Sequence, residues 1–200
     1  MDNVSYIIAD TVSNHAVMID PTWEVDGLIS ACDHQQLTCK AIWLTHTHYD
    51  HIQGLDACIQ RWPDLPVFVH ANEQQTCAHL NNVQVIQDGD TLSLGNGKWT
   101  VWHTPGHSPG GVCFYTDGHL ISGDTLFVDR CGRADIQGAD VKLLYQSLQR
   151  LKLLPPNTII YPGHDYGHQP TDTLGQQLGR NPYLKADSEA EFIRLRMGQG

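Results

Sequence analysis

The segment from Thr45 to His51 restricts what this chain can fold into more than any other feature. It reads Thr-His-Thr-His-Tyr-Asp-His and directly follows the short apolar run 41–44, which predicts a buried strand. On a helix, His46 and His48 would point about 200° apart. We therefore expect a loop at the carboxyl end of the strand, with both imidazoles facing one point, rather than a solvated polar segment. Four potential metal ligands within six residues indicate a metal site.

A second pattern occurs three times further along the chain. In each case a predicted strand ends, a glycine permits a tight turn, and a residue that can bind metal follows at once. The three pairs are Gly106-His107, Gly123-Asp124 and Gly163-His164. One such pair alone is uninformative. Three of them would deliver ligands from three separate strands to one edge of the sheets, and with segment 45–51 they suffice for two metal sites.

Composition and charge bound the classes of function. The 200 residues are 40% hydrophobic and 17% charged, which is typical of a folded globular protein, and this length predicts a single domain over residues 1–200. The net charge of −10 argues against nucleic acid or an anionic membrane as the partner. We expect a small-molecule substrate and a monomer or a dimer. The start of the chain does not resemble a signal peptide, so a cytoplasmic location is expected.

The coarse pattern predicts an α/β chain of the α+β kind, in which helices sandwich two sheets. Residues 83–86, 91–94 and 98–103 should form one meander, because Asp-Gly and Asn-Gly turns separate them. A helix should run from the N-cap Asp140 to Leu151, since apolar residues recur on one face. The polar tail 165–200 should hold one closing helix, 188–197. Further strands are expected at 5–9, 16–20, 41–45, 67–69, 111–115, 120–122 and 158–161, and further helices at 25–32 and 55–62.

Two longer stretches connect these motifs with a known family. They are Gly-Asp-Thr-Leu-Phe-Val-Asp-Arg-Cys-Gly-Arg at 123–133 and Tyr-Pro-Gly-His-Asp-Tyr at 161–166. With the histidine-rich segment, they resemble the metallo-β-lactamase superfamily, and within it glyoxalase II, a hydroxyacylglutathione hydrolase, and the related persulfide dioxygenases. The resemblance covers most of the chain and implies a four-layer αββα sandwich. Because only 36 residues follow His164, the helical C-terminal domain of glyoxalase II is expected to be absent.

The resemblance also implies a set of metal ligands. The implied ligands are His46, His48 and His107 for a first ion, Asp50, His51 and His164 for a second ion, and Asp124 bridging both ions together with a hydroxide. Imidazole and carboxylate donors suit zinc, iron or manganese. We expect two divalent ions, zinc foremost, with iron or manganese as alternatives.

Such a site suits the hydrolysis of an acyl thiolester. The metal-bridging hydroxide would attack the carbonyl, and Asp50 would be the catalytic residue that orients the hydroxide and accepts its proton. The leaving thiolate has a pKa of about 8.5, so no dedicated general acid is required. The resemblance places Arg133 and Tyr166 near the carboxylates of the thiol carrier, as substrate-binding residues. A structural ion pair is an equally good interpretation of Arg133.

Other functions fit the same ligands. A mononuclear iron persulfide dioxygenase is the main alternative, because glyoxalase II has an aromatic residue where Asp135 stands here, and the Cys-Gly-Arg-x-Asp form is the one seen in the dioxygenase relatives. Another hydrolase of the fold, of the lactonase or β-lactamase type, is a further alternative. A metal-binding module without catalysis fits least well, since a complete ligand set with an open position is typical of catalytic sites.

Overall fold

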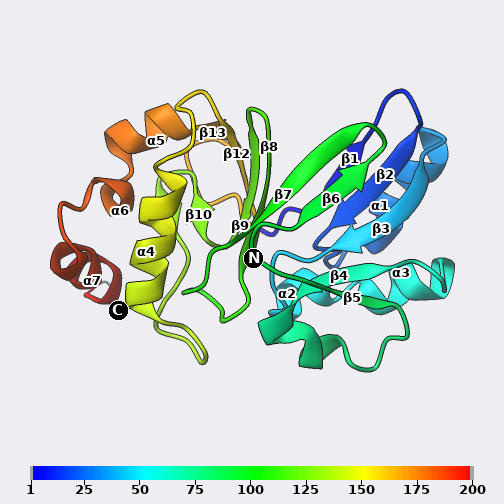
Figure 1. Cartoon of the computed structure of the whole chain (residues 1–200), viewed down its shortest axis with the longest axis horizontal. Helices are drawn as coiled ribbons and strands as arrows, with labels where there is room; N and C mark the ends of the chain where they lie inside the picture. Colours follow the sequence, from blue (N-terminus) through cyan, green and yellow to red (C-terminus); the bar gives the residue numbers. More distant parts are fainter. Residues whose placement is uncertain (1, 199–200) are drawn as a thin grey trace.

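Two β-sheets pack face to face, and helices cover the outer face of each. The computed structural model describes residues 2–198. Figure 1 shows the order of the layers, with α4 to α7 on one side, the sheet containing β7, β8, β9 and β12 next to them, then the sheet containing β1 to β4, and α1 and α3 beyond it. This confirms the four-layer αββα sandwich expected from the sequence.

The first sheet has five strands in the order β1-β2-β3-β4-β5. Strand β1 is antiparallel to β2, and all other pairs in this sheet are parallel. The helices α1 and α3 follow β2 and β3 in the chain. The bounds are β1 (Tyr6–Ala9), β2 (His15–Ile19), α1 (Val25–His34), β3 (Thr38–Trp43), α2 (Tyr49–Ile52), α3 (Leu55–Arg61), β4 (Val67–His70), the 3₁₀ helix η1 (Ala71–Cys77) and β5 (Val83–Ile86).

The second sheet has six strands in the order β13-β12-β9-β8-β7-β6. Strands β6 to β9 form an antiparallel meander, and β12 joins β9 in parallel. The bounds are β6 (Thr91–Leu94), β7 (Gly97–His103), β8 (Val112–Thr116), β9 (His119–Gly123), β10 (Leu126–Phe127), β11 (Arg130–Cys131), α4 (Val141–Leu151), β12 (Ile159–Pro162), β13 (Asp172–Thr173), α5 (Leu174–Arg180), α6 (Pro182–Lys185) and α7 (Glu189–Met197).

Three apolar cores separate the four layers. Successive side chains of a strand point to opposite faces of its sheet. Trp43 on β3 therefore packs between the sheets, where its ring centroid lies 5.3 Å from that of Phe114, whereas its neighbour Ile42 faces the layer of α1 and α3. On the outer face of the second sheet, Leu120 and Ile160 pack against α4 and the C-terminal helices. Burial on both faces of each sheet fixes the register of its strands.

Two expectations from the sequence were wrong. Strand 83–86 does not join the meander with 91–94, but pairs in parallel with β4 in the first sheet, so the chain passes between the sheets at Asp88. The described part of the tail, residues 165–198, contains three helices rather than one. The unexpected α5 and α6 are only 7 and 4 residues long, too short to give a clear apolar period.

The expected helix boundaries are otherwise close to those observed. Asp140 caps α4 with its side chain, which accepts hydrogen bonds from two backbone amides of the first turn. Within residues 2–198 no helix combines the length and the apolar character that crossing a bilayer requires.

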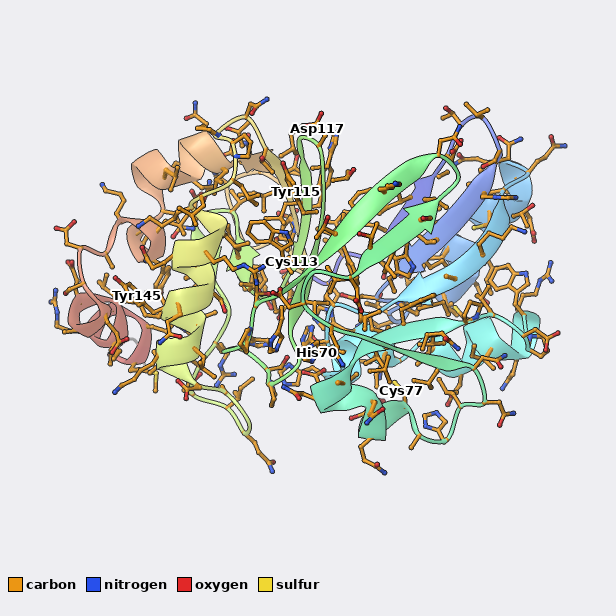
Figure 2. The ribbon with its side chains drawn as sticks, viewed as in Figure 1. His70, Cys77, Cys113, Tyr115, Asp117 and Tyr145 are labelled. Atoms are coloured by element: carbon orange, nitrogen blue, oxygen red, sulfur yellow. The ribbon has the colours of Figure 1, made fainter. Side chains whose placement is uncertain are left out.

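All six cysteines are free and buried, so they serve as small core residues. Figure 2 places two of them in different halves of the sandwich, Cys113 on β8 and Cys77 at the end of η1. Burial raises the pKa of each of these two thiols to about 11. Neither thiol is therefore the reactive thiolate of a redox site.

Candidate metal centre

Four loops at the carboxyl ends of β3, β7, β9 and β12 bring the seven predicted ligands together. The loop after β3 carries His46 and His48, as expected, but the chain then enters the short helix α2, which presents Asp50 and His51. The other three loops carry the residues that follow a glycine. These are His107 after β7, Asp124 after β9 and His164 after β12.

The first group consists of three histidines. Donor atoms of His46, His48 and His107 all lie within 4.8 Å of one another. His48 Nδ1 lies 2.9 Å from His107 Nε2, and the ring centroids of His46 and His48 are 4.6 Å apart. This arrangement matches the first ligand set predicted from the sequence.

The second group consists of a carboxylate and two histidines. Donor atoms of Asp50, His51 and His164 lie within 4.8 Å of one another. His51 Nε2 is 3.3 Å from His164 Nε2, and Asp50 Oδ2 is 3.4 Å from His164 Nε2. This group matches the second predicted set.

Asp124 lies between the two groups. Its Oδ2 is 3.4 Å from His107 Nε2 in the first group and 3.3 Å from His164 Nε2 in the second. Its Oδ1 is 3.2 Å from His51 Nε2. A single carboxylate thus faces both groups, as a bridging ligand must.

Hydrogen bonds at the outer nitrogen turn the inner nitrogen of three histidines toward the centre. His107 Nδ1 donates to the Arg133 carbonyl oxygen at 2.9 Å, and His51 Nδ1 faces Asp20 Oδ2 at 3.0 Å. His46 Nδ1 lies 3.1 Å from Thr45 Oγ1. An imidazole that donates from Nδ1 keeps a lone pair on Nε2, which is the tautomer that binds a metal.

The unpaired nitrogen lone pairs of the first group, His46, His48 and His107, show that this group fits a bound cation. His46 Nε2 is buried without a hydrogen-bond partner among the described residues, which is costly for a polar atom. The inward nitrogens of His48 and His107 face each other rather than a donor. A divalent ion would satisfy all three lone pairs, and the nitrogen and oxygen donor set suits zinc, iron or manganese.

Burial keeps the first group neutral. It lowers the pKa of His46 well below its ordinary value and also lowers the pKa values of His48 and His107. Neutral imidazoles are the form that binds metal.

In the metal-free protein, His51 and Asp124 carry opposite charges. Burial opposes the charge of His51, but the carboxylates of Asp124 and Asp20 outweigh burial and raise its pKa to about 10 in the metal-free protein. Burial likewise opposes ionisation of Asp124, yet the neighbouring His51 and His164 hold its pKa well below the ordinary value. Asp124 is therefore an anion at neutral pH.

A cavity of about 500 Å³ opens above the two groups. Its wall includes both predicted substrate-binding residues, Arg133 and Tyr166, together with Phe127. The Tyr166 ring stacks on His164 with centroids 4.7 Å apart. The Arg133 side chain is 63% exposed, and its guanidinium forms a bidentate pair with Asp135 at 3.0 and 3.1 Å. Arg133 thus lines the cavity and at the same time forms an ion pair, and its role in substrate binding stays a prediction.

Sequence reasoning missed two buried carboxylates that hold the ligand loops. Asp20 follows β2 and accepts from Thr45 N at 2.7 Å as well as facing His51. Glu73 in η1 accepts from the backbone amides of Thr47 and Gly110, and so ties the loop of His48 to the loop of His107. The position of Asp20 at the end of a buried strand, where the ligand loops also begin, could have marked it as part of the site. Glu73 had none, because nothing in its local sequence marks it.

Comparisons with known proteins find a family model and several relatives that this chain resembles. A model of the metallo-beta-lactamase superfamily matches residues 2–164. The chain is 32% identical over 199 residues to the probable polyketide biosynthesis zinc-dependent hydrolase BaeB of Bacillus velezensis, covering 97% of this chain and 87% of that protein. It is 36% identical over 167 residues to the hydroxyacylglutathione hydrolase of Tolumonas auensis, covering 82% of this chain and 62% of that enzyme. This chain thus spans less than two thirds of the latter enzyme.

A solved structure extends the similarity to nearly the whole fold. The crystal structure of ETHE1 from Myxococcus xanthus superimposes with a TM-score of 0.89 at 32% sequence identity. The superposition covers 98% of this chain and 85% of ETHE1, and so includes the three C-terminal helices that follow residue 164.

Proposed function

The chain belongs to the metallo-beta-lactamase superfamily, and from that premise we propose that it is a metal-dependent hydrolase of acyl thiolesters. The observation that carries this proposal is the pair of ligand groups that share Asp124 beneath the cavity. His46, His48 and His107 would hold one divalent ion, and Asp50, His51 and His164 the other. The zinc-dependent relative favours zinc over iron or manganese.

Divalent ions held there would polarise the substrate carbonyl and supply hydroxide at neutral pH, because they lower the pKa of bound water to about 7. Asp50 lines the cavity, and its Oδ2 faces His164. Its carboxylate would orient the attacking water and accept the proton. Asp124 would keep the two ligand groups at a fixed separation, because it faces both.

Arg133 and Tyr166 would recognise the thiol carrier. Arg133 is the cationic side chain of the cavity wall, and its guanidinium can bind an anionic group of the carrier while Asp135 holds it in place. The phenol of Tyr166 would add a hydrogen bond. The hydroxyacylglutathione hydrolase relative supports a glutathione thiolester, and the polyketide-biosynthesis relative supports a different thiol carrier.

A panel of thiolesters tests this proposal. Zinc-loaded protein would be assayed with S-D-lactoylglutathione, followed by ultraviolet absorbance, and with acyl-coenzyme A and acyl-N-acetylcysteamine thiolesters, followed by thiol release. We expect turnover of at least one substrate, which Asp124→Ala abolishes. The proposal is wrong if no thiolester is cleaved faster than by Asp124→Ala.

The ETHE1 similarity supports one further candidate, a mononuclear iron persulfide dioxygenase. The Asp135 position also favours it, as the sequence indicated. Protein purified without added metal separates the two candidates. One iron per chain and oxygen uptake with glutathione persulfide would establish the dioxygenase, whereas two ions and no oxygen uptake would support the hydrolase.

A further inference from the structure

The N-terminal segment 2–6 lies across the loops that carry the second ligand group. Its backbone pairs with the loop of His164 through two hydrogen bonds of 2.9 Å, which set Asn3 opposite His164 in an antiparallel bridge. Ser5 Oγ donates to the carbonyl oxygen of Asp20 at 2.6 Å. The segment is therefore anchored on both sides of the second group.

The side chain of Asn3 contacts Asp50 directly. Its Nδ2 donates to Asp50 Oδ2 at 2.9 Å and to the Asp50 carbonyl oxygen at 3.2 Å. Trp23 Nε1 donates to Asn3 Oδ1 at 3.5 Å. A primary amide has two hydrogens and one acceptor oxygen, so these contacts engage the whole group. A flipped amide would place its oxygen against the carboxylate and lose the Trp23 contact, so the surroundings fix its orientation.

Asn3 donates a hydrogen bond to the oxygen of Asp50 that faces the metal centre. The same Oδ2 lies 3.4 Å from His164 Nε2 and 4.0 Å from His51 Nε2. Asp50 is the only member of the second group that is not almost fully buried, with its side chain 18% exposed. It is thus the ligand with most freedom to rotate into the cavity if a contact is lost.

We propose that Asn3 is a positioning residue that holds the Asp50 carboxylate toward His51 and His164, and thereby sets the affinity of the second ion and the rate of hydrolysis. The part concerning the rate rests on the proposed function, and the part concerning affinity rests only on the metal centre. Hydrogen-bond partners of metal ligands typically contribute about 10- to 100-fold in affinity or activity.

Two substitutions of Asn3 and one matched control test the proposal. Asn3→Leu keeps the approximate shape without a donor, and Asn3→Asp sets a carboxylate against Asp50. Asn82→Leu is the control, because Asn82 is also half-buried and also donates from Nδ2 to a carbonyl oxygen, that of Pro63 at 3.0 Å, away from the metal centre. Thermal unfolding of the metal-free protein checks that each variant folds. If Asn3→Leu does not fold, Asn3→Asp alone tests the proposal.

Zinc titration against a chelator of known affinity, with the metal-free proteins, gives the first readout. We expect one of the two binding steps to weaken by about 10- to 100-fold in both Asn3 variants, and neither step to change in Asn82→Leu. Steady-state kinetics at saturating zinc gives the second readout. There kcat should fall while KM stays near that of the unaltered protein, because Asn3 does not line the cavity of the substrate.

The outcomes separate this inference from the proposed function. Both zinc steps unchanged in the Asn3 variants would overturn the positioning role. Equal weakening of both steps, or the same weakening in Asn82→Leu, would also overturn it, since the effect would then be on the fold as a whole. If the unaltered protein cleaves no thiolester, the proposed function fails, while the zinc titration still decides the role of Asn3.

Discussion

His51 Nδ1 lies 3.0 Å from Asp20 Oδ2, and both side chains are almost completely buried. Asp20 directly follows β2, and His51 lies in α2, 31 positions further along the chain. Asp20 also accepts from the backbone amide of Thr45, so one carboxylate fixes both the start of the ligand loop and the ring of His51. A histidine held in this way presents Nε2 to the metal in a single orientation.

Replacing Asp20 should therefore weaken the metal centre without touching a ligand. Asp20→Asn keeps the shape but loses the charge, and we expect one zinc-binding step to weaken by about 10- to 100-fold. Chelator-competition titration measures this. Asp33→Asn is the control, since Asp33 is exposed and pairs with Arg61 at 3.6 Å on the surface. Zinc affinity equal to that of the control would refute the role assigned to Asp20.

Removing a direct ligand should have a larger effect. His46→Ala deletes the buried nitrogen that lacks a partner, so the first ion loses one of its three imidazoles. We expect the affinity for this ion, and thiolester turnover with it, to fall by more than about 100-fold, the upper end for loss of an outer partner, so that dialysed protein keeps fewer than two ions per chain. Elemental analysis after dialysis checks this. His34→Ala is the control, because His34 ends α1 on the surface. Full zinc retention in His46→Ala would contradict the ligand assignment.

Gly163 has no side chain and so leaves room for the carboxylate of Asp124 and the imidazole of His51. A Cβ at this position would lie 2.3 Å from Asp124 Oδ1 and 2.8 Å from His51 Cε1. Gly163→Ala should thus displace the bridging carboxylate, reduce zinc binding and cost about 1–3 kcal/mol of unfolding free energy. Gly179→Ala in α5 provides the contrast, because no atom lies within 4 Å of a Cβ placed at this position. This substitution should raise the free energy of unfolding by about 0.5–1 kcal/mol. Denaturant unfolding and zinc titration measure both, and a harmless Gly163→Ala would show that Asp124 does not need this space.

The metal-free protein should lose stability as pH rises above neutral. Burial opposes protonation of His51, but Asp124 and Asp20 raise its folded pKa to about 10, whereas an unfolded histidine has a pKa of about 6.5. The stabilisation is complete below the unfolded pKa and is lost as pH rises through the folded one. From pH 6.5 to 8 we expect a slope of up to about 1.4 kcal/mol per pH unit, which His51→Gln should remove. Equal slopes in both proteins, measured by denaturant unfolding after chelation, would contradict this.

The C-terminal helices should unfold together with the sheets. Phe192 of α7 is fully buried in the outer core, where its ring centroid lies 5.5 Å from that of Tyr145 on α4. Phe192→Ala should cost about 3–5 kcal/mol, whereas Leu153→Ala, at a residue 82% exposed, should stay within about 0.5 kcal/mol. The sequence predicts one domain over residues 1–200, so unfolding should be a single transition. Two transitions would refute that prediction.

Local sequence patterns were enough to predict much of the fold and to predict that the candidate metal ligands lie together. The helix after Asp140 was predictable because its cap and its apolar face coincide in the sequence. The seven candidate ligands were predictable because four of them follow closely after one buried strand and three follow a glycine at the end of a strand, and the carboxyl ends of such strands meet at one edge. Their role as metal ligands stays a prediction, as do the roles of Arg133 and Tyr166 in substrate binding.

Long-range relationships could not be predicted in the same way. Strand 83–86 carries no mark of the sheet it joins, and its parallel pairing with β4 depends on η1, which lies between them and has no apolar period. Asp20, Glu73 and Asn3 act on the metal centre through hydrogen bonds that span 25 to 47 positions. No spacing rule connects residues that are brought together only by the packing of the whole chain.

The stacked pair His70 and His103 illustrates the same limit. Their ring centroids lie 3.9 Å apart, at the junction of β4 with η1 and the end of β7, and Figure 2 shows His70 near the meeting point of the two halves. Neither histidine directly follows a glycine at the end of a strand, so the sequence marks neither as a candidate ligand. His103 Nε2 also lies 3.0 Å from the carbonyl oxygen of Pro109, in the loop of His107.

The metal content of protein purified without added metal tests the central claim most directly. Inductively coupled plasma mass spectrometry on the unaltered chain and on Asp124→Ala, normalised to protein concentration, would give the ions per chain. We predict about two divalent ions per unaltered chain, mostly zinc, and a clear loss in Asp124→Ala. An unaltered chain that holds no divalent ion, and takes up none from micromolar zinc, would contradict the account.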